Sequence, residues 1–169
     1  MKPEKSTAPV ALFCLIAIAI AWGLKRHYSM AGPRDLRWIL GPTAGLVEIL
    51  SGHPFYFDPD VGHINPDLGI IIAPSCAGVN FLIALFSLGA FSGIFRFSRF
   101  MTRCLWLPAC LLWAVFATIG VNAFRIWISI FLITADFHWG WLSPHRVHRM
   151  AGIVIYFFFL CVFYPIIQR

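Results

Sequence analysis

The longest apolar stretch of the chain is residues 104–135, CLWLPACLLWAVFATIGVNAFRIWISIFLITA. Asn122 and Arg125 are the strongly polar residues that interrupt these 32 residues. As one straight α-helix the stretch would be about 48 Å long, whereas the core of a bilayer is about 30 Å thick. We therefore expect a span over about 104–123, then Arg125 near an interface, and a second helical piece continuing to about 135.

The composition of the whole chain also indicates a membrane protein. Of 169 residues, 60% are hydrophobic and 12% are charged, against about 45–50% apolar and about 25% charged in soluble domains. This excludes a water-soluble globule. Spans of about 20 residues each leave no room for a separate soluble domain. We expect a single all-α integral membrane domain over 1–169 with four to five transmembrane helices.

Four other apolar segments fit this architecture. Residues 8–24, between basic residues, predict an uncleaved anchor helix, and 70–95 and 150–167 predict spans. Residues 36–50, LRWILGPTAGLVEIL, reach only about 22 Å as a helix, so they are a short span, a tilted re-entrant helix or an interfacial helix. We therefore divide the chain into an anchor helix and linker, 1–35, and a core, 36–167.

Two polar stretches separate the apolar segments. Residues 51–69, SGHPFYFDPDVGHINPDLG, are rich in Pro, Gly, Asp and His, which predicts an aqueous loop with hairpin-like turns around 58–60 and 65–67. Residues 136–149, DFHWGWLSPHRVHR, predict an interfacial loop, because Trp side chains favour the level of the headgroups. We expect the first loop to lie outside the cytoplasm, directly before the helix that carries Cys76.

Basic residues bear on the number of crossings. If 36–50 does not cross, six Lys and Arg residues fall on the side of Arg96 and seven on the other; if it crosses, the numbers are eight and five. The positive-inside rule then favours five crossings, with the Arg96 loop in the cytoplasm. Either arrangement gathers Cys76, Arg125 and His148 at the outer face of the cytoplasmic membrane.

The net charge of +6 bears on partners. In a soluble protein this charge would suggest nucleic acid, but here the basic residues flank apolar segments. We therefore expect anionic lipid headgroups as partners and no nucleic acid.

One of the five cysteines stands apart. Four lie inside apolar runs and are expected to be small hydrophobic residues. Cys76 lies in the sequence PSCAG, where an aqueous loop enters a span. The start of a helix favours the thiolate, and small neighbours leave room for a substrate backbone. The alternative is a buried structural cysteine at a tight turn.

Arg125 and two histidines could act with Cys76. Arg125 has no carboxylate within one helical turn; it either reaches lipid headgroups or stabilises an anion beside a thiolate. His148 begins the last span, with Gly152 one turn later, and can exchange the thiol proton. His145 is the competing candidate for that role. Both histidines could instead contact lipid phosphate within a basic cluster.

A metal site is not favoured by the sequence. His138 with His145 and His148, or His53 with His63, would allow one. However, there is no HExxH sequence, and no second cysteine lies near Cys76. We expect neither a metal nor another cofactor.

Three sequences together resemble a known family. PSCAG at 74–78, NAFRI at 122–126 and HRMAG at 148–152 occur in the order, and at the helix ends, found in the exosortase/archaeosortase family of membrane cysteine transpeptidases. The resemblance covers about 36–165. Because a single helix precedes this core, the chain looks most like the compact K-type exosortases, whereas other members carry more spans before the core.

The resemblance implies a function and roles for three residues. Such enzymes cleave C-terminal sorting tails of secreted proteins, of the PEP-CTERM kind, and transfer the proteins to an acceptor. By position, Cys76 is the nucleophile, Arg125 the family arginine and His148 the family histidine. A non-enzymatic membrane scaffold or lipid-binding subunit is the alternative function, and a metal or haem carrier is a third.

Overall fold

We describe a computed structural model of the chain, which covers residues 7–134 and 144–168. For residues 7, 133 and 144–148 it describes the helical backbone but not the side chains. The chain is mostly helical. Its helices are α1 (Thr7–Met30), α2 (Arg37–Ser51), α3 (Val79–Arg96), α4 (Phe100–Thr134) and α5 (Pro144–Gln168), and its strands are β1 (Tyr56–Asp58), β2 (Gly62–Asn65) and β3 (Ile70–Ile72).

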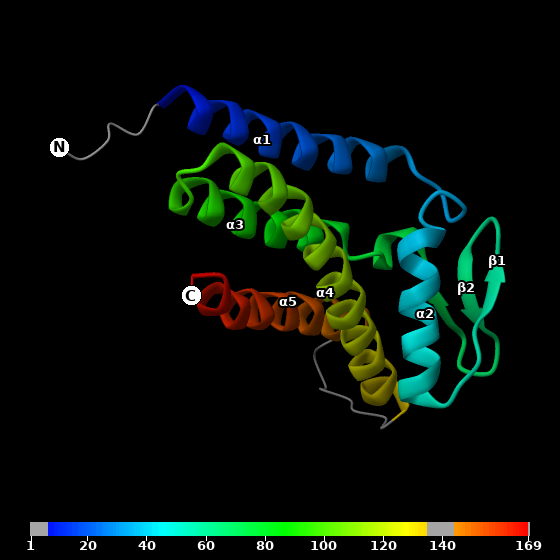
Figure 1. Cartoon of the computed structure of the whole chain (residues 1–169). Helices are drawn as coiled ribbons and strands as arrows, with labels where there is room; N and C mark the ends of the chain where they lie inside the picture. The colour runs from blue at the N-terminus through cyan, green and yellow to red at the C-terminus, as the bar shows by residue number, and fades with distance from the viewer. Residues whose placement is uncertain (1–6, 135–143, 169) are drawn as a thin grey trace.

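Four helices of the described chain, α1, α3, α4 and α5, are long and apolar enough to cross a membrane. The axes of α1, α3 and α5 lie roughly parallel, with the chain running through α1 toward the sheet and through α3 and α5 away from it, and α4 crosses them obliquely (Figure 1). Helix α2 and the strands lie at one end of this bundle, which we call the sheet end. At the opposite end, the Arg96 end, Arg96 Nη1 donates a hydrogen bond of 3.1 Å to the carbonyl of Gln168.

Helix α2 runs across the direction of α1, α3 and α5 instead of alongside them (Figure 1). It has 15 residues and is not among the helices of the described chain that could span a membrane. The sequence allowed three interpretations of 36–50: a short span, a tilted re-entrant helix or an interfacial helix. The direction of α2 fits the interfacial helix, which lies along the ends of the spans. The preference for five crossings therefore loses its basis, because it required this segment to cross.

Residues 100–134 form one continuous helix, so the expected division of 104–135 near residue 123 is wrong. The extra length has a physical explanation. The second half of α4 continues beyond the bundle and packs against α2 at the sheet end (Figure 1). The side chains of Asn122 and Arg125 find hydrogen-bond partners inside the protein, so the helix need not end where the polar residues begin.

The loop before Cys76, for which the sequence predicts a hairpin with turns around 58–60 and 65–67, contains a small antiparallel sheet whose two connections lie at these turns; the all-α fold class did not include its strands. Its order is β1-β2-β3, with Phe57 opposite His63 and Ile64 opposite Ile71. Residues 70–72 therefore do not begin the span expected at 70–95. Three consecutive isoleucines favour a strand, and Pro74 keeps the preceding residue extended, so α3 begins only at Val79.

Two apolar clusters hold these parts together. One joins α2 to the sheet, the start of α3 and the second half of α4, and includes Leu36, Leu40, Val47, Ile72 and Ile126. The other joins the four long helices and includes Phe13, Phe86, Ile94, Leu107 and Ala114. Beside water, burying each large apolar side chain contributes about 1.5–3 kcal/mol. Between helices surrounded by lipid, close packing of side chains stabilises the contacts instead.

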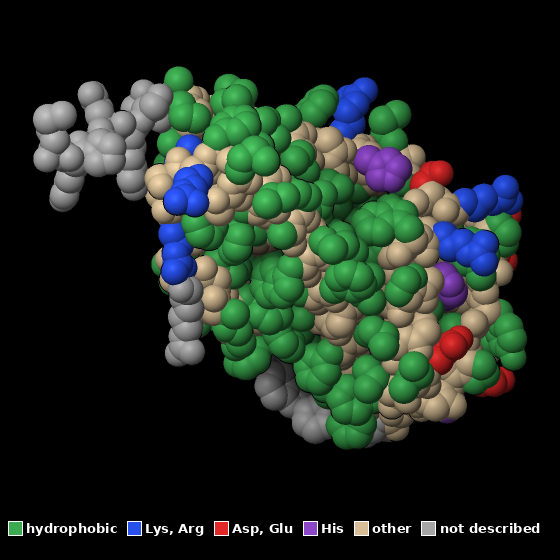
Figure 2. Space-filling view, viewed as in Figure 1, with side chains coloured by type: hydrophobic (Ala, Val, Ile, Leu, Met, Phe, Trp, Pro, Cys, Tyr) green, Lys and Arg blue, Asp and Glu red, His purple; other side chains and the backbone are tan. Residues whose placement is uncertain are grey.

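The surface agrees with a membrane-embedded protein. Figure 2 shows apolar side chains over the bundle, whereas Asp, Glu and His lie at the sheet end together with Lys and Arg, and of these the opposite end shows only Lys or Arg. Large apolar side chains on all four long helices are exposed, among them Leu15 at 64%, Phe95 at 61%, Leu105 at 70% and Phe157 at 68%. Such exposure would be unfavourable in water and is expected against lipid.

Candidate active site

Cys76 lies in a tight turn between β3 and α3. Residues Pro74–Cys76 form one turn of 3₁₀-helix, in which Cys76 N donates to the carbonyl of Ala73 at 2.8 Å. Cys76 is half-buried and carries a free thiol. It packs against the apolar cluster that joins α2 to the sheet, the start of α3 and the second half of α4. Ser75, beside it, is exposed.

Gly78 allows this turn to approach α4 and α5. Its φ of +70° lies in the left-handed region, which residues with a side chain rarely adopt. A Cβ at this position would lie 3.1 Å from the Tyr156 hydroxyl and 3.2 Å from Thr118 Cγ2. Both the backbone conformation and the close packing therefore require glycine at position 78.

Asn122 connects the cysteine turn to α5. Its Nδ2 donates a hydrogen bond to the carbonyl of Cys76, and its Oδ1 accepts one from the Tyr156 hydroxyl at 2.7 Å. Asn122 is fully buried. Because a buried amide is costly unless it is hydrogen-bonded, this network orders the position of Cys76 relative to α4 and α5.

Arg125 lies one helical turn after Asn122 and belongs to the same network. Its Nη1 donates to the Tyr156 hydroxyl at 3.2 Å, and its guanidinium lies 5.3 Å from the centre of the Tyr156 ring. An arginine inside a membrane costs about 2.5–3.5 kcal/mol unless the protein compensates it. Tyr156 supplies part of that compensation through its hydroxyl and its ring.

Gly152 on α5 makes room for Arg125. A Cβ on Gly152 would lie 2.6 Å from Arg125 Nε and 3.2 Å from Arg125 Cζ. The backbone of α5 therefore contacts the guanidinium directly. This contact gives a physical reason for a glycine four residues after His148, since i and i+4 share a helix face.

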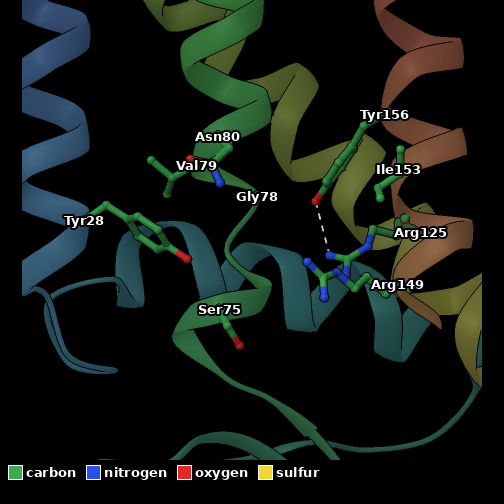
Figure 3. Close-up of a pocket in the computed structure, with 10 residues that line it drawn as sticks. Tyr28, Ser75, Gly78, Val79, Asn80, Arg125, Arg149, Ile153 and Tyr156 are labelled. Carbon is green, nitrogen blue, oxygen red and sulfur yellow. Dashed lines mark hydrogen bonds between the residues drawn. The ribbon is translucent and has the colours of Figure 1, made fainter. Parts of the chain in front are cut away.

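A cavity of about 390 Å³ opens beside this network. It is lined by residues from α1, the cysteine turn, α3, α4 and α5, including Tyr28, Ser75, Asn80, Arg125, Arg149 and Tyr156. Figure 3 shows the guanidinium groups of Arg125 and Arg149 and the hydroxyl of Tyr28 directed toward the same space. Since none of its described lining residues is Asp or Glu, the cavity suits an anion or a carbonyl oxygen that gains negative charge.

Helix α1 contributes a wall of this cavity. Tyr28 lies near its last turn, and Lys25 Nζ donates a hydrogen bond of 2.8 Å to Asn80 Oδ1 on α3. This contact joins α1 to α3 at the sheet end. The helix expected as an N-terminal anchor is therefore also part of the candidate site.

The structure brings two of the three predicted site residues together. Cys76 and Arg125 are linked through Asn122 and Tyr156, although they are far apart in sequence. Ser75 lines the cavity, whereas Cys76 is not among its described lining residues. His145 and His148 lie in the first turns of α5, and their side chains fall outside the described residues.

Three side chains of the site were not predicted from the sequence: Tyr28, Arg149 and Tyr156. Tyr156 had a signal, because it lies four residues after Gly152 on the same helix face and is polar in an apolar span. Arg149 was included in a basic cluster expected to contact lipid. Tyr28 had no signal, since only the packing of α1 against α3 brings it to the site.

The described residues contain no group of three His, Cys, Asp or Glu side chains that could hold a metal ion. His53 and His63 are among the described residues, whereas His138 lies outside them. The chemistry that the described site offers is a thiol, two guanidinium groups, hydroxyls and an amide.

Comparisons with known proteins identify no similar protein. The chain matches no family model, no curated protein and no solved structure. The resemblance to exosortases therefore depends on the three short sequences around Cys76, Arg125 and His148.

Proposed function

We propose that the chain is a membrane cysteine transpeptidase of the exosortase kind. It cleaves C-terminal sorting tails of secreted proteins at the outer face of the cytoplasmic membrane and transfers the proteins to an acceptor. Cys76 is the nucleophile, Arg125 stabilises negative charge, and His148 moves the proton.

The observation that carries this proposal is the hydrogen-bond network around Asn122. It connects Cys76, Arg125 and Tyr156, which come from the turn before α3, from α4 and from α5. These are the three places where the family sequences occur. A purely lipid-contacting arginine would not require this connection through a buried amide beside a polar cavity.

The chemistry follows from the groups present. The Cys76 thiolate adds to the scissile carbonyl and forms a tetrahedral oxyanion, which a guanidinium donor such as Arg125 stabilises. The C–N bond then breaks, leaving a thioester on Cys76, and the departing amine takes a proton from the histidine. An acceptor amine or water attacks the thioester, which releases the product and restores the thiol.

Helical periodicity supports His148 over His145 as the proton carrier. His148, Gly152 and Tyr156 are spaced at i, i+4 and i+8, so they belong to one face of α5. Gly152 and Tyr156 are the α5 residues in contact with Arg125. His145 precedes His148 by three residues and has no glycine four residues later.

The test is co-expression with a secreted reporter that ends in a Pro-Glu-Pro segment, an apolar helix and arginines. Wild type should shorten the reporter on a blot, and Cys76→Ala, Arg125→Ala and His148→Ala should abolish this. Tyr156→Phe should slow it about tenfold or more, because Arg125 loses an acceptor and Asn122 a donor. His145→Ala should leave processing intact.

Matched controls separate catalysis from folding. Cys104 is an exposed cysteine on α4, so Cys104→Ala should process the reporter like wild type. Hydroxylamine should release a thioester-linked fragment from wild type and none from Cys76→Ala. Unchanged processing by Cys76→Ala would refute the enzyme proposal and favour a scaffold, whose function would be lost only when several basic loop residues are replaced together.

A further inference from the structure

The cavity at the candidate site continues along the bundle as an apolar groove between α3 and α5. One hollow of about 430 Å³ is lined by Ala84 and Leu88 of α3 and by α5 side chains that include Phe157 and Leu160. A second, of about 540 Å³, shares Ala84 and Leu88 and extends to Phe95. We call these two hollows together the α3–α5 groove.

The cavity and the α3–α5 groove are lined by one face of α3 and one face of α5. On α3 the lining residues follow a helical stripe from Asn80 in the cavity through Ala84 and Leu88 to Phe95. On α5 the corresponding stripe includes Ile153 in the cavity, then Phe157, Leu160 and Tyr164, and reaches Gln168. The cavity and the groove are therefore adjacent sections of one surface.

The cavity and the groove together have the length of a membrane-spanning partner. From Arg149 to Gln168, α5 rises about 28 Å, close to the bilayer core of about 30 Å. The cavity end is polar. The groove is mainly apolar, with Ser87, Ser92 and Gln168 toward the Arg96 end and with Phe157 and Tyr164 exposed at 68% and 52%. Ala84 and Ser87 are small residues of the kind that let another helix approach closely.

We propose that the α3–α5 groove binds the apolar tail helix of the substrate. This inference rests on the proposed function and assigns its substrate-binding surface. The tail lies along α3 and α5 with its first residues toward the sheet end. The peptide preceding the tail then enters the cavity, where Arg125 and Arg149 complement its carbonyl oxygens or acidic side chains.

Cross-linking tests the position of the tail directly. A photoreactive benzoylphenylalanine replaces Leu160, in the groove, or Leu15, exposed on α1 outside the described groove. Both variants carry Cys76→Ala, so the reporter stays uncleaved and the readout does not depend on activity. The Leu160 variant should cross-link the reporter through its apolar helix, and the Leu15 variant should give at least about tenfold less product.

Filling the groove tests its contribution to processing. Ala84→Trp puts a large side chain into the groove, whereas Ala19→Trp puts the same side chain on the exposed surface of α1. Ala84→Trp should lower reporter processing about tenfold or more because the tail cannot pack. Ala19→Trp should stay within about twofold of wild type.

The outcomes distinguish this inference from the proposed function. Processing by wild type with equal cross-linking at both positions would overturn the groove and leave the enzyme proposal standing. Cross-linking at Leu160 without processing by wild type would refute the enzyme and retain the tail site. A product of twice the mass of the chain, or cross-links to lipid alone, would overturn the groove in favour of a second copy or of lipid.

Discussion

The chemistry of the site depends on how a few polar side chains satisfy one another inside an apolar chain. Asn122 gives one hydrogen bond to the Cys76 carbonyl and accepts one from Tyr156, and Tyr156 accepts one from Arg125. Asn122 Nδ2, the Tyr156 hydroxyl and Arg125 Nη1 thus each donate to a partner within a short chain of contacts, where unsatisfied groups would cost several kcal/mol in lipid. Gly152 contributes to this arrangement by its lack of a side chain.

Gly152→Ala should therefore impair the site. The added methyl group would lie 2.6 Å from Arg125 Nε, so the guanidinium or α5 must move. We expect reporter processing to fall about tenfold or more. Gly120→Ala is the matched control, because a Cβ at Gly120 on α4 meets no atom within 4 Å. It should process normally; equal losses in both variants would contradict this account of Gly152.

The elements at the sheet end together hold the cysteine turn in place. Strand β3 pairs with β2 and leads into Pro74, while α2 packs against the second half of α4. His63 on β2 is buried at 8% exposure, and its ring lies 5.1 Å from that of Phe57. Desolvation by burial lowers the pKa of His63; nearby Arg37 lowers it further, and Glu48 opposes the change.

The sheet end should therefore lose stability in mild acid. The lowered pKa means that the unfolded chain binds more protons than the folded chain once the pH falls through about 6.5. The contribution of neutral His63 to the free energy of unfolding is therefore full above that pH and declines below it. The decline ends once the pH is low enough for His63 to be protonated in the folded chain as well. The unfolding midpoint of purified protein in detergent should therefore be lower at pH 5.5 than at pH 7.5, in part because of His63.

The variant His63→Gln provides the comparison for this pH effect. Its midpoint should change less over the same interval, whereas His53→Gln should keep the wild-type pH dependence. An identical slope in wild type and His63→Gln would show that burial of His63 does not control stability.

At the scale of the molecule, the arrangement of the helices determines the number of crossings. With α2 across the ends of the spans, the start of α1 lies at the Arg96 end, together with the α3–α4 connection (Figure 1). Six basic residues then belong to that side and seven to the other: Lys2, Lys5, Arg96, Arg99, Arg103 and Arg169, against Lys25, Arg26, Arg34, Arg37, Arg125, Arg146 and Arg149. Basic residues alone thus cease to determine sidedness.

Cysteine labelling tests this arrangement. In a variant whose native cysteines are replaced by alanine, Asp60→Cys lies in the β1–β2 turn and Ser98→Cys lies between α3 and α4. A membrane-impermeant maleimide should label only one of the two in intact cells. An N-terminal tag should share the side of Ser98; a tag on the side of Asp60 would indicate five crossings.

Some of this structure could be predicted from the sequence, and some could not. The apolar segments that became α1, α3, α4 and α5 were recognisable because a span must satisfy its backbone internally and needs about 20 apolar residues. The division near Arg125 was wrong because the cost of an arginine depends on partners that the sequence does not position. The start of α3 was misjudged because Ile70–Ile72 pair with β2.

The sequence by itself determined that the chain is a helical membrane protein, and it marked Cys76, Arg125 and His148 as candidates, because long apolar runs make every polar interruption conspicuous. Only the tertiary structure decided that Tyr28, Arg149 and Tyr156 belong to the same site and that a groove leads from it along α3 and α5. The physical reason is distance along the chain. Helical periodicity relates residues within one helix, whereas contacts between α1, α3, α4 and α5 arise from packing that no local pattern encodes.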